Sequence, residues 1–221
     1  EKLSIEGYAV RYQQYFSEGW DIFKKYPVGF MGLFLISAVL YFFISQSGTY
    51  ISNMVSVVLS SLFLACNYHM AHYLKKGGIP SFEVFFEPLK DPLQLVIYAL
   101  LSSLLVGIGF VFLIIPGLYL VVSWVFAIPI IVFTKTEFWP AMEYSRKVIT
   151  RQWFQIFGFL VLCFFVILLG ALALGIGIIV AMPVVYCSLY AAFSDIFGLR
   201  TQEGNPESNN NWPDEDSDIT Y

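Results

Sequence analysis

The stretch PLQLVIYALLSSLLVGIGFVFLIIPGLYLVVSWVFAIPIIVF, residues 92–133, contains no Asp, Glu, Lys or Arg. A helix that crosses a hydrocarbon core of roughly 30 Å needs about 20 apolar residues, so this stretch is long enough for two such helices. Pro116 and Gly117 interrupt it with residue types that are typical of tight turns. The stretch therefore predicts a transmembrane hairpin whose two helices meet at Pro116 and Gly117.

The same reasoning applies to the rest of the chain, which contains four further apolar stretches without a charged residue. The chain is 58% hydrophobic and 13% charged, whereas soluble domains carry about 25% charged residues. A soluble fold is therefore disfavoured. The sequence predicts an all-α fold, a polytopic membrane bundle of six transmembrane helices in three hairpins. The six predicted spans are residues 28–45, 51–73, 92–115, 118–133, 153–174 and 175–193.

The charges predict the orientation of these spans. All twelve Lys and Arg residues lie before the first span or in the long segments that follow the second, fourth and sixth spans. The short connections inside the hairpins carry no charge. Because basic residues accumulate on the cytoplasmic side of membranes, we expect both termini to be cytoplasmic and the protein to lie in the cell inner membrane. Residues 1–197 would form one six-span domain.

The end of the chain differs from this domain, because residues 203–221 hold six acidic residues and no basic residue. This segment also has too few apolar residues to form a hydrophobic core. Residues 198–221 are therefore predicted to be a disordered acidic cytoplasmic tail. This tail either only solvates the protein or binds a cytoplasmic partner. The residues that would make the contact are Trp212, Asp214, Glu215 and Asp216.

A weak threefold repeat precedes the hairpins, in the segments that begin at Phe16, Ser81 and Phe138. In each segment apolar residues recur at helical spacing and charged residues take the opposite face. We expect a cytoplasmic, interfacial amphipathic helix before every hairpin, with Ser81 as the N-cap of the second. Such a helix is either a plain anchor or a sensor of the lipid surface.

Few polar residues fall inside the predicted spans. His69 and His72 stand at i and i+3 and can share a face with Cys66, but no third ligand has convincing metal-site spacing. We therefore expect no metal and no cofactor, and predict that His69 bonds to a neighbouring span while His72 lies at the cytoplasmic interface beside Lys75. Asn67 is expected to form an interhelical hydrogen bond.

Proline and glycine mark the irregular points of the bundle. Pro129 and Pro183 each remove a backbone donor from the middle of a span and predict kinks, which would either line a cavity or be rigid packing features. Ser103 and Gly107, at four-residue spacing, predict the close approach of a neighbouring helix. The complete set of candidate polar or hinge positions inside the membrane is Asn67, His69, His72, Pro116, Gly117, Pro129 and Pro183.

Four features of the region that follows Ile114 resemble the YciC-like inner-membrane proteins and the related membrane domain found beside some glycerophosphoryl diester phosphodiesterases. They are the turn at Pro116-Gly117, the Ala127-Ile128-Pro129 step, the Ala141-x-x-x-Ser145 pair and the aromatic and basic entry into the fifth span. The segment GWDIFKKYP, which contains Trp20, also looks like the start of that family. The resemblance covers most of residues 10–197 and implies a six-span bundle with both ends in the cytoplasm, without implying an agreed biochemical activity.

The sequence contains no paired carboxylates, nucleophile with a base, or metal cluster of the kind that catalysis needs. The expected function is therefore that of a non-enzymatic integral membrane protein, a scaffold or assembly component of a membrane complex. The expected partners are the lipid bilayer and a protein that binds through the tail or the bundle, and no nucleic acid. The alternative is a transporter or lipid carrier for an uncharged or amphipathic substrate, which the two prolines and the repeat favour.

Overall fold

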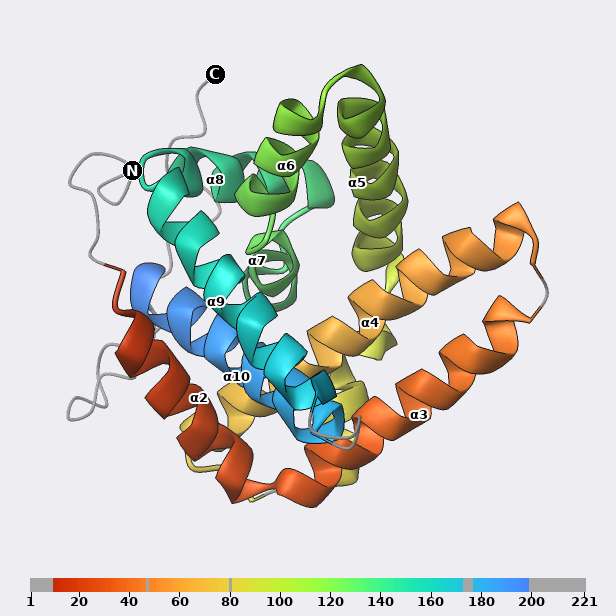
Figure 1. Ribbon diagram of the computed structural model, residues 1–221. Helices are drawn as coiled ribbons and strands as arrows, with labels where there is room; N and C mark the ends of the chain where they lie inside the picture. The colour runs from red at the N-terminus through yellow and green to blue at the C-terminus, as the bar shows by residue number, and fades with distance from the viewer. Residues whose placement is uncertain (1–9, 47, 80, 173–176, 199–221) are drawn as a thin grey trace.

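The computed structural model describes residues 10–46, 48–79, 81–172 and 177–198, and within them every regular element is a helix (Figure 1). The prediction of an all-α bundle is confirmed. In chain order the elements are α2 (Tyr12–Lys25), α3 (Pro27–Ser45), α4 (Tyr50–Lys75), η1 (Phe82–Lys90), α5 (Leu93–Phe112), α6 (Ile114–Ser123), α7 (Ala127–Thr134), α8 (Phe138–Thr150), α9 (Trp153–Leu172) and α10 (Ile178–Ile196).

Six segments of the described chain are long and apolar enough to cross a membrane, so the protein is a multi-pass membrane protein. Five of the spans are single helices, namely α3, α4, α5, α9 and α10. The remaining one, which is fourth in chain order, consists of α6 and α7 and extends over Ile114–Thr134. The sixth span begins at Ile178 and ends at Ile196, and therefore extends beyond the predicted limit at residue 193.

Helix α10 forms the centre of the bundle, and α2, α4 and α9 pack around it (Figure 1). In its most apolar 18-residue window 67% of the residues are buried, compared with 22% for α3 and for α5 and 17% for α9. Helix α2 approaches α10 closely because Gly19 has no side chain, and a Cβ at that position would overlap Ser188. A helix that is covered on several faces in this way is typical of a core, whereas the described chain leaves most of the surface of α3, α5 and α9 uncovered.

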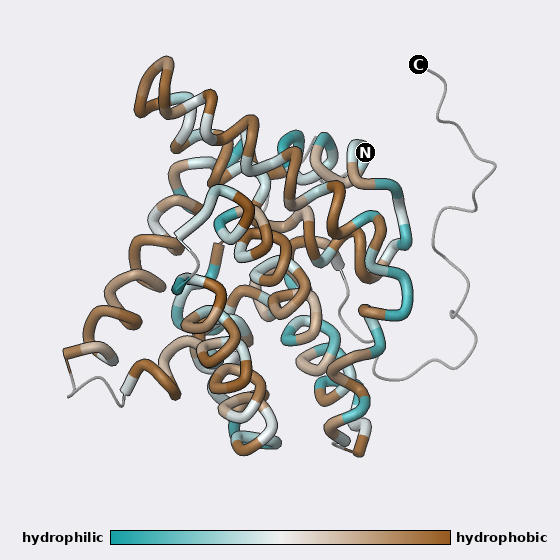
Figure 2. Tube along the Cα trace, turned by 90° about the vertical axis from the view of Figure 1, so that its right-hand side faces the viewer, coloured by the Kyte–Doolittle hydropathy of each residue, from teal (hydrophilic) through white to brown (hydrophobic). Residues whose placement is uncertain are grey.

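Apolar side chains are exposed mainly on the outer helices, where a bilayer would cover them. Figure 2 shows mainly apolar segments extending to the left and hydrophilic segments gathering toward the right. Phe43 near the end of α3, Val111 near the end of α5 and Leu172 at the end of α9 are 68%, 85% and 72% exposed. Exposure of this extent in an apolar helix end is expected for a surface that contacts acyl chains.

The turn of the second hairpin lies at Leu113, and the predicted turn at Pro116 and Gly117 is wrong. Leu113 is extended, with φ −162° and ψ 146°, and α6 begins at the next residue. Pro116 is accommodated in the first turn of α6, where its missing N–H would have no intrahelical partner. Gly109 of α5 allows the hairpin to close, because a Cβ built on it would lie only 2.9 Å from Gly117 Cα, and Gly117 itself packs against the ring of Phe110.

The fourth span is divided into two helices, which is a larger irregularity than the kink predicted at Pro129. Helix α6 ends at Ser123 and α7 begins at Ala127, so Pro129 lies in the first turn of α7, where its missing N–H is tolerated. Helix α10, in contrast, continues without interruption past Pro183. The two prolines therefore have different structural roles.

The three segments that precede the hairpins are helical, but they are not equivalent. Helix α2 and helix α8 are α-helices, whereas η1 is a 3₁₀ helix that contains Pro88. The proline lacks a donor and disfavours the α conformation in the residue before it, which explains the tighter winding. Ser81 has the extended backbone of an N-cap, but its side chain forms no capping hydrogen bond. Ser81 therefore occupies the predicted N-cap position, without the side-chain hydrogen bond that usually stabilises it.

Candidate functional site

The two histidines of α4 bond to two different elements. A hydrogen bond of 2.8 Å joins His69 Nε2 to Glu87 Oε2 of η1, and one of 2.7 Å joins His72 Nδ1 to Tyr190 Oη of α10. The prediction that His69 bonds to a neighbouring span is wrong, because its partner belongs to the segment before the third span. The imidazole of His72 bonds to the central helix, which the sequence did not indicate, and its location at the cytoplasmic interface beside Lys75 stays a prediction. No group of three or more His, Cys, Asp or Glu side chains with metal-site geometry occurs in the part of the chain that the structure describes.

A network of polar side chains ties the end of α4 to α2 and α10. Lys75 Nζ forms an ion pair with Glu18 and donates a hydrogen bond of 2.9 Å to Ser194 Oγ. Tyr15, which has no exposed surface, donates a hydrogen bond of 2.9 Å to Asp195 Oδ2. Burial raises the pKa of Tyr15 to about 12. The network holds α2 against the central helix, so α2 is a docked part of the bundle.

The break in the fourth span is stabilised by hydrogen bonds from other helices. Ser145 Oγ of α8 donates to the backbone oxygen of Ser123 at 2.7 Å, and Tyr98 Oη of α5 donates to that of Trp124 at 3.3 Å. These donors satisfy carbonyl groups at the end of α6. Ser145 belongs to the Ala141-x-x-x-Ser145 pair noted in the sequence, and both residues of that pair are buried.

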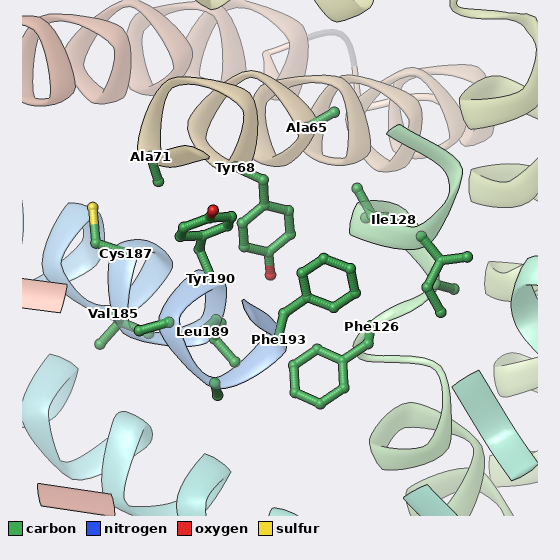
Figure 3. Close-up of a cluster of buried hydrophobic side chains, with 14 of the residues drawn as sticks. Ala65, Tyr68, Ala71, Phe126, Ile128, Val185, Cys187, Leu189, Tyr190 and Phe193 are labelled. Carbon is green, nitrogen blue, oxygen red and sulfur yellow. The ribbon is translucent and has the colours of Figure 1, made fainter. Parts of the chain in front are cut away.

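Aromatic packing fixes the same break against the central helix. Figure 3 shows Phe126 beside Phe193, with Tyr68 and Tyr190 in the same cluster. The ring centroids of Phe126 and Phe193 lie 5.9 Å apart, and Phe126 has no exposed surface. The break is therefore packed and hydrogen-bonded as a rigid feature, and its backbone oxygens at Ser123 and Trp124 are already occupied by protein donors.

A pocket of about 320 Å³ lies beside His69, between α4, η1, α5 and α7. Its wall carries the polar or charged side chains of Glu87, Lys90, Asp91 and Lys135, and its apolar surface includes Leu95. Sequence reasoning did not identify this pocket, because its residues come from segments far apart in the chain. The one feature of the sequence that could have indicated the pocket is the group of charged residues beside the start of the third span and the end of the fourth.

Asn67 does not form the predicted interhelical bond. Its Nδ2 donates to the backbone oxygen of Phe63 at 2.8 Å, one turn earlier in the same helix. The Oδ1 atom of Asn67 is buried and has no hydrogen-bond partner among the described residues. The Nδ2 atom of Asn67 therefore bonds to a backbone oxygen within α4 and forms no hydrogen bond to another helix.

Gly107 faces open space, which overturns the expectation that it packs against another helix of this chain. A Cβ built on Gly107 would meet no heavy atom within 4 Å. Gly107 lies in a shallow groove on the outer face of α5, together with Ser103, Leu104 and Ile108. Close helix packing instead occurs two residues later, at Gly109.

The proposed tail contacts at Trp212, Asp214, Glu215 and Asp216 lie outside the described residues. No family model, curated protein or solved structure matches the chain.

Proposed function

We propose that this protein is a non-enzymatic scaffold or assembly component of a membrane complex, with the outer face of α5 as its contact surface. The proposal includes an inner-membrane location with both termini in the cytoplasm, which the distribution of basic residues supports. It also includes membership of the YciC-like proteins, on the resemblance of the region after Ile114.

The groove around Gly107 is the observation that carries the proposal. Small residues in membrane helices allow the backbones of two helices to approach closely, and Ser103 and Gly107 form such a pair. None of the helices that the structure describes occupies the groove, since a Cβ on Gly107 would meet no described heavy atom within 4 Å. A transmembrane helix of another protein would gain van der Waals contact there that acyl chains provide less well.

Gly107→Leu tests this proposal because a leucine would fill the groove without disturbing the bundle. The matched control is Gly32→Leu on α3, where a Cβ also meets nothing within 4 Å. Both variants should be at least as stable to heating as the natural protein in mild detergent. On native gels of solubilised membranes, Gly107→Leu should lose the large assembly and Gly32→Leu should keep it. An assembly that survives Gly107→Leu would rule out this groove as the contact.

A second candidate function, carriage of an amphipathic substrate, is favoured by the pocket beside His69 together with the divided fourth span. Divided helices line substrate sites in many transporters. The discriminating experiment compares substrate uptake in membranes that contain the natural protein, Gly107→Leu or Ser145→Ala, because Ser145 donates the hydrogen bond that holds the break in the fourth span. Loss of uptake only in Ser145→Ala would favour carriage over assembly.

A further inference from the structure

The pocket beside His69 has the size and composition of a site for a small polar group. Its volume of about 320 Å³ is near the lower end of the range of roughly 300–1,000 Å³ for small-molecule sites. Four separate elements contribute to it, namely α4, η1, α5 and α7. Apolar side chains of Leu95, Ile131 and Val132 adjoin the charged ones, so the pocket has an apolar part and a polar part.

The charges in the pocket have both signs and are incompletely paired. Lys90 at the end of η1 and Lys135 at the end of α7 form no ion pair with any described residue, and neither does Asp91. Glu87 is fixed by its hydrogen bond of 2.8 Å to His69. Two free ammonium groups and two carboxylates thus line one cavity, which complements a ligand that carries an anionic and a cationic group.

The backbone at Lys135 gives an independent reason to connect this residue with a ligand. Lys135 ends α7 with φ 52° and ψ 23°, and it is the one non-glycine residue with positive φ in the described parts of the chain. Glycine or asparagine is the usual residue at such a left-handed helix end. A lysine in the left-handed conformation at a helix end is an exception to this preference, and such exceptions concentrate at functional sites.

The position of the pocket favours a lipid over a soluble ligand. Its wall includes Gln94 in the first turn of the third span, and Leu93 beside it is 60% exposed on the apolar surface. The pocket therefore lies where a span meets the polar segment before it, which is the depth of lipid headgroups. The exposed apolar surface at the start of α5, around Leu93, would contact the acyl chains of a lipid whose headgroup occupies the pocket.

We propose that this pocket binds the headgroup of a glycerophospholipid that carries a phosphate and a primary ammonium. Lys90 and Lys135 bind the phosphate, and Asp91 together with Glu87 binds the ammonium. The site is separate from the groove around Gly107 and does not depend on the assembly function.

Native mass spectrometry of the full chain in detergent tests the site, with dioleoylphosphatidylethanolamine titrated as the probe. Lys135→Gly is the most informative variant, because glycine suits the left-handed backbone and the fold should remain at least as stable to heating. Lys90→Gln and Asp91→Asn remove the other charges. Lys76→Gln is the matched control, since Lys76 is exposed and does not line the pocket.

Lys135→Gly and Lys90→Gln should each weaken binding of the lipid about tenfold, the usual effect of removing one charged hydrogen-bond donor, whereas Lys76→Gln should not. Asp91→Asn should abolish the preference for phosphatidylethanolamine over phosphatidylglycerol. Unchanged binding by the two lysine variants would overturn the proposal. If the natural protein binds phosphatidylglycerol as tightly as phosphatidylethanolamine, the ammonium contact is refuted and the proposal fails. If it binds glycerophosphoethanolamine as tightly as phosphatidylethanolamine, the ligand is a soluble molecule and the proposal also fails.

Discussion

Replacing Gly107 and Gly109 of α5 separately by alanine should affect stability very differently, although they are two positions apart in one helix. A Cβ on Gly107 meets no heavy atom within 4 Å. A Cβ on Gly109 would lie 2.9 Å from the Cα and 3.0 Å from the nitrogen of Gly117. Because these are backbone atoms of a closed hairpin, they cannot move away without separating α5 from α6.

The magnitude follows from two terms. Replacing a helical glycine by alanine stabilises the helix by about 1 kcal/mol at either position. Overpacking costs about 1–3 kcal/mol, and only Gly109→Ala incurs it. The backbone term cancels when the two variants are compared. Gly107→Ala should therefore raise the free energy of unfolding by up to about 1 kcal/mol, and Gly109→Ala should lie about 1–3 kcal/mol below it.

Reversible unfolding in mixed micelles, followed by far-ultraviolet circular dichroism, measures these free energies. Gly32→Ala on α3 is the control for the backbone term, because a Cβ there is also free of contacts within 4 Å. It should behave like Gly107→Ala. If Gly109→Ala proves as stable as Gly107→Ala, the close contact between α5 and α6 is incorrect, and so is the placement of the turn at Leu113.

Three further predictions follow from the polar contacts and the tail. Burial raises the pKa of Tyr15 to about 12, above the ordinary value of 10, so its stabilising effect is complete below pH 10 and is lost as the pH rises through about 12. A shift of this size corresponds to about 3 kcal/mol, and Tyr15→Phe should remove this part of the pH dependence of unfolding. Ser145→Ala should destabilise the protein by about 1–3 kcal/mol, because the carbonyl of Ser123 loses its donor, whereas Ser45→Ala at the exposed end of α3 should have little effect in the same unfolding assay. Truncation after Arg200 should leave membrane insertion and the melting temperature unchanged but remove a cytoplasmic partner from pull-downs; retention of that partner would exclude the tail contact at Trp212.

The number and approximate limits of the spans could be predicted from the sequence because they depend on local properties. Long apolar stretches bounded by charges indicate spans directly, and α3 begins and ends within one residue of the predicted limits. The internal form of the fourth span could not be predicted in the same way. Its break is stabilised by Ser145 and Tyr98, which belong to other helices, so it depends on contacts between residues distant in the sequence.

The candidate site was predictable only in part. The sequence identified His69 and His72 as unusual polar residues in a span, but not their partners Glu87 and Tyr190, because helix periodicity does not show which neighbouring helix a face contacts. Gly107 shows the same limit. A small residue indicates that a close approach is possible, but not whether the neighbouring helix belongs to the same chain.

Site-specific photo-crosslinking in native membranes tests the central claim most directly, because it reports what lies against the outer face of α5 without purification. A photoreactive amino acid would replace Gly107 in one variant and Gly32 in the other, both of which face open space in this chain. The assembly function predicts a discrete protein crosslink from position 107 and only lipid adducts from position 32. Lipid adducts alone at both positions would contradict it.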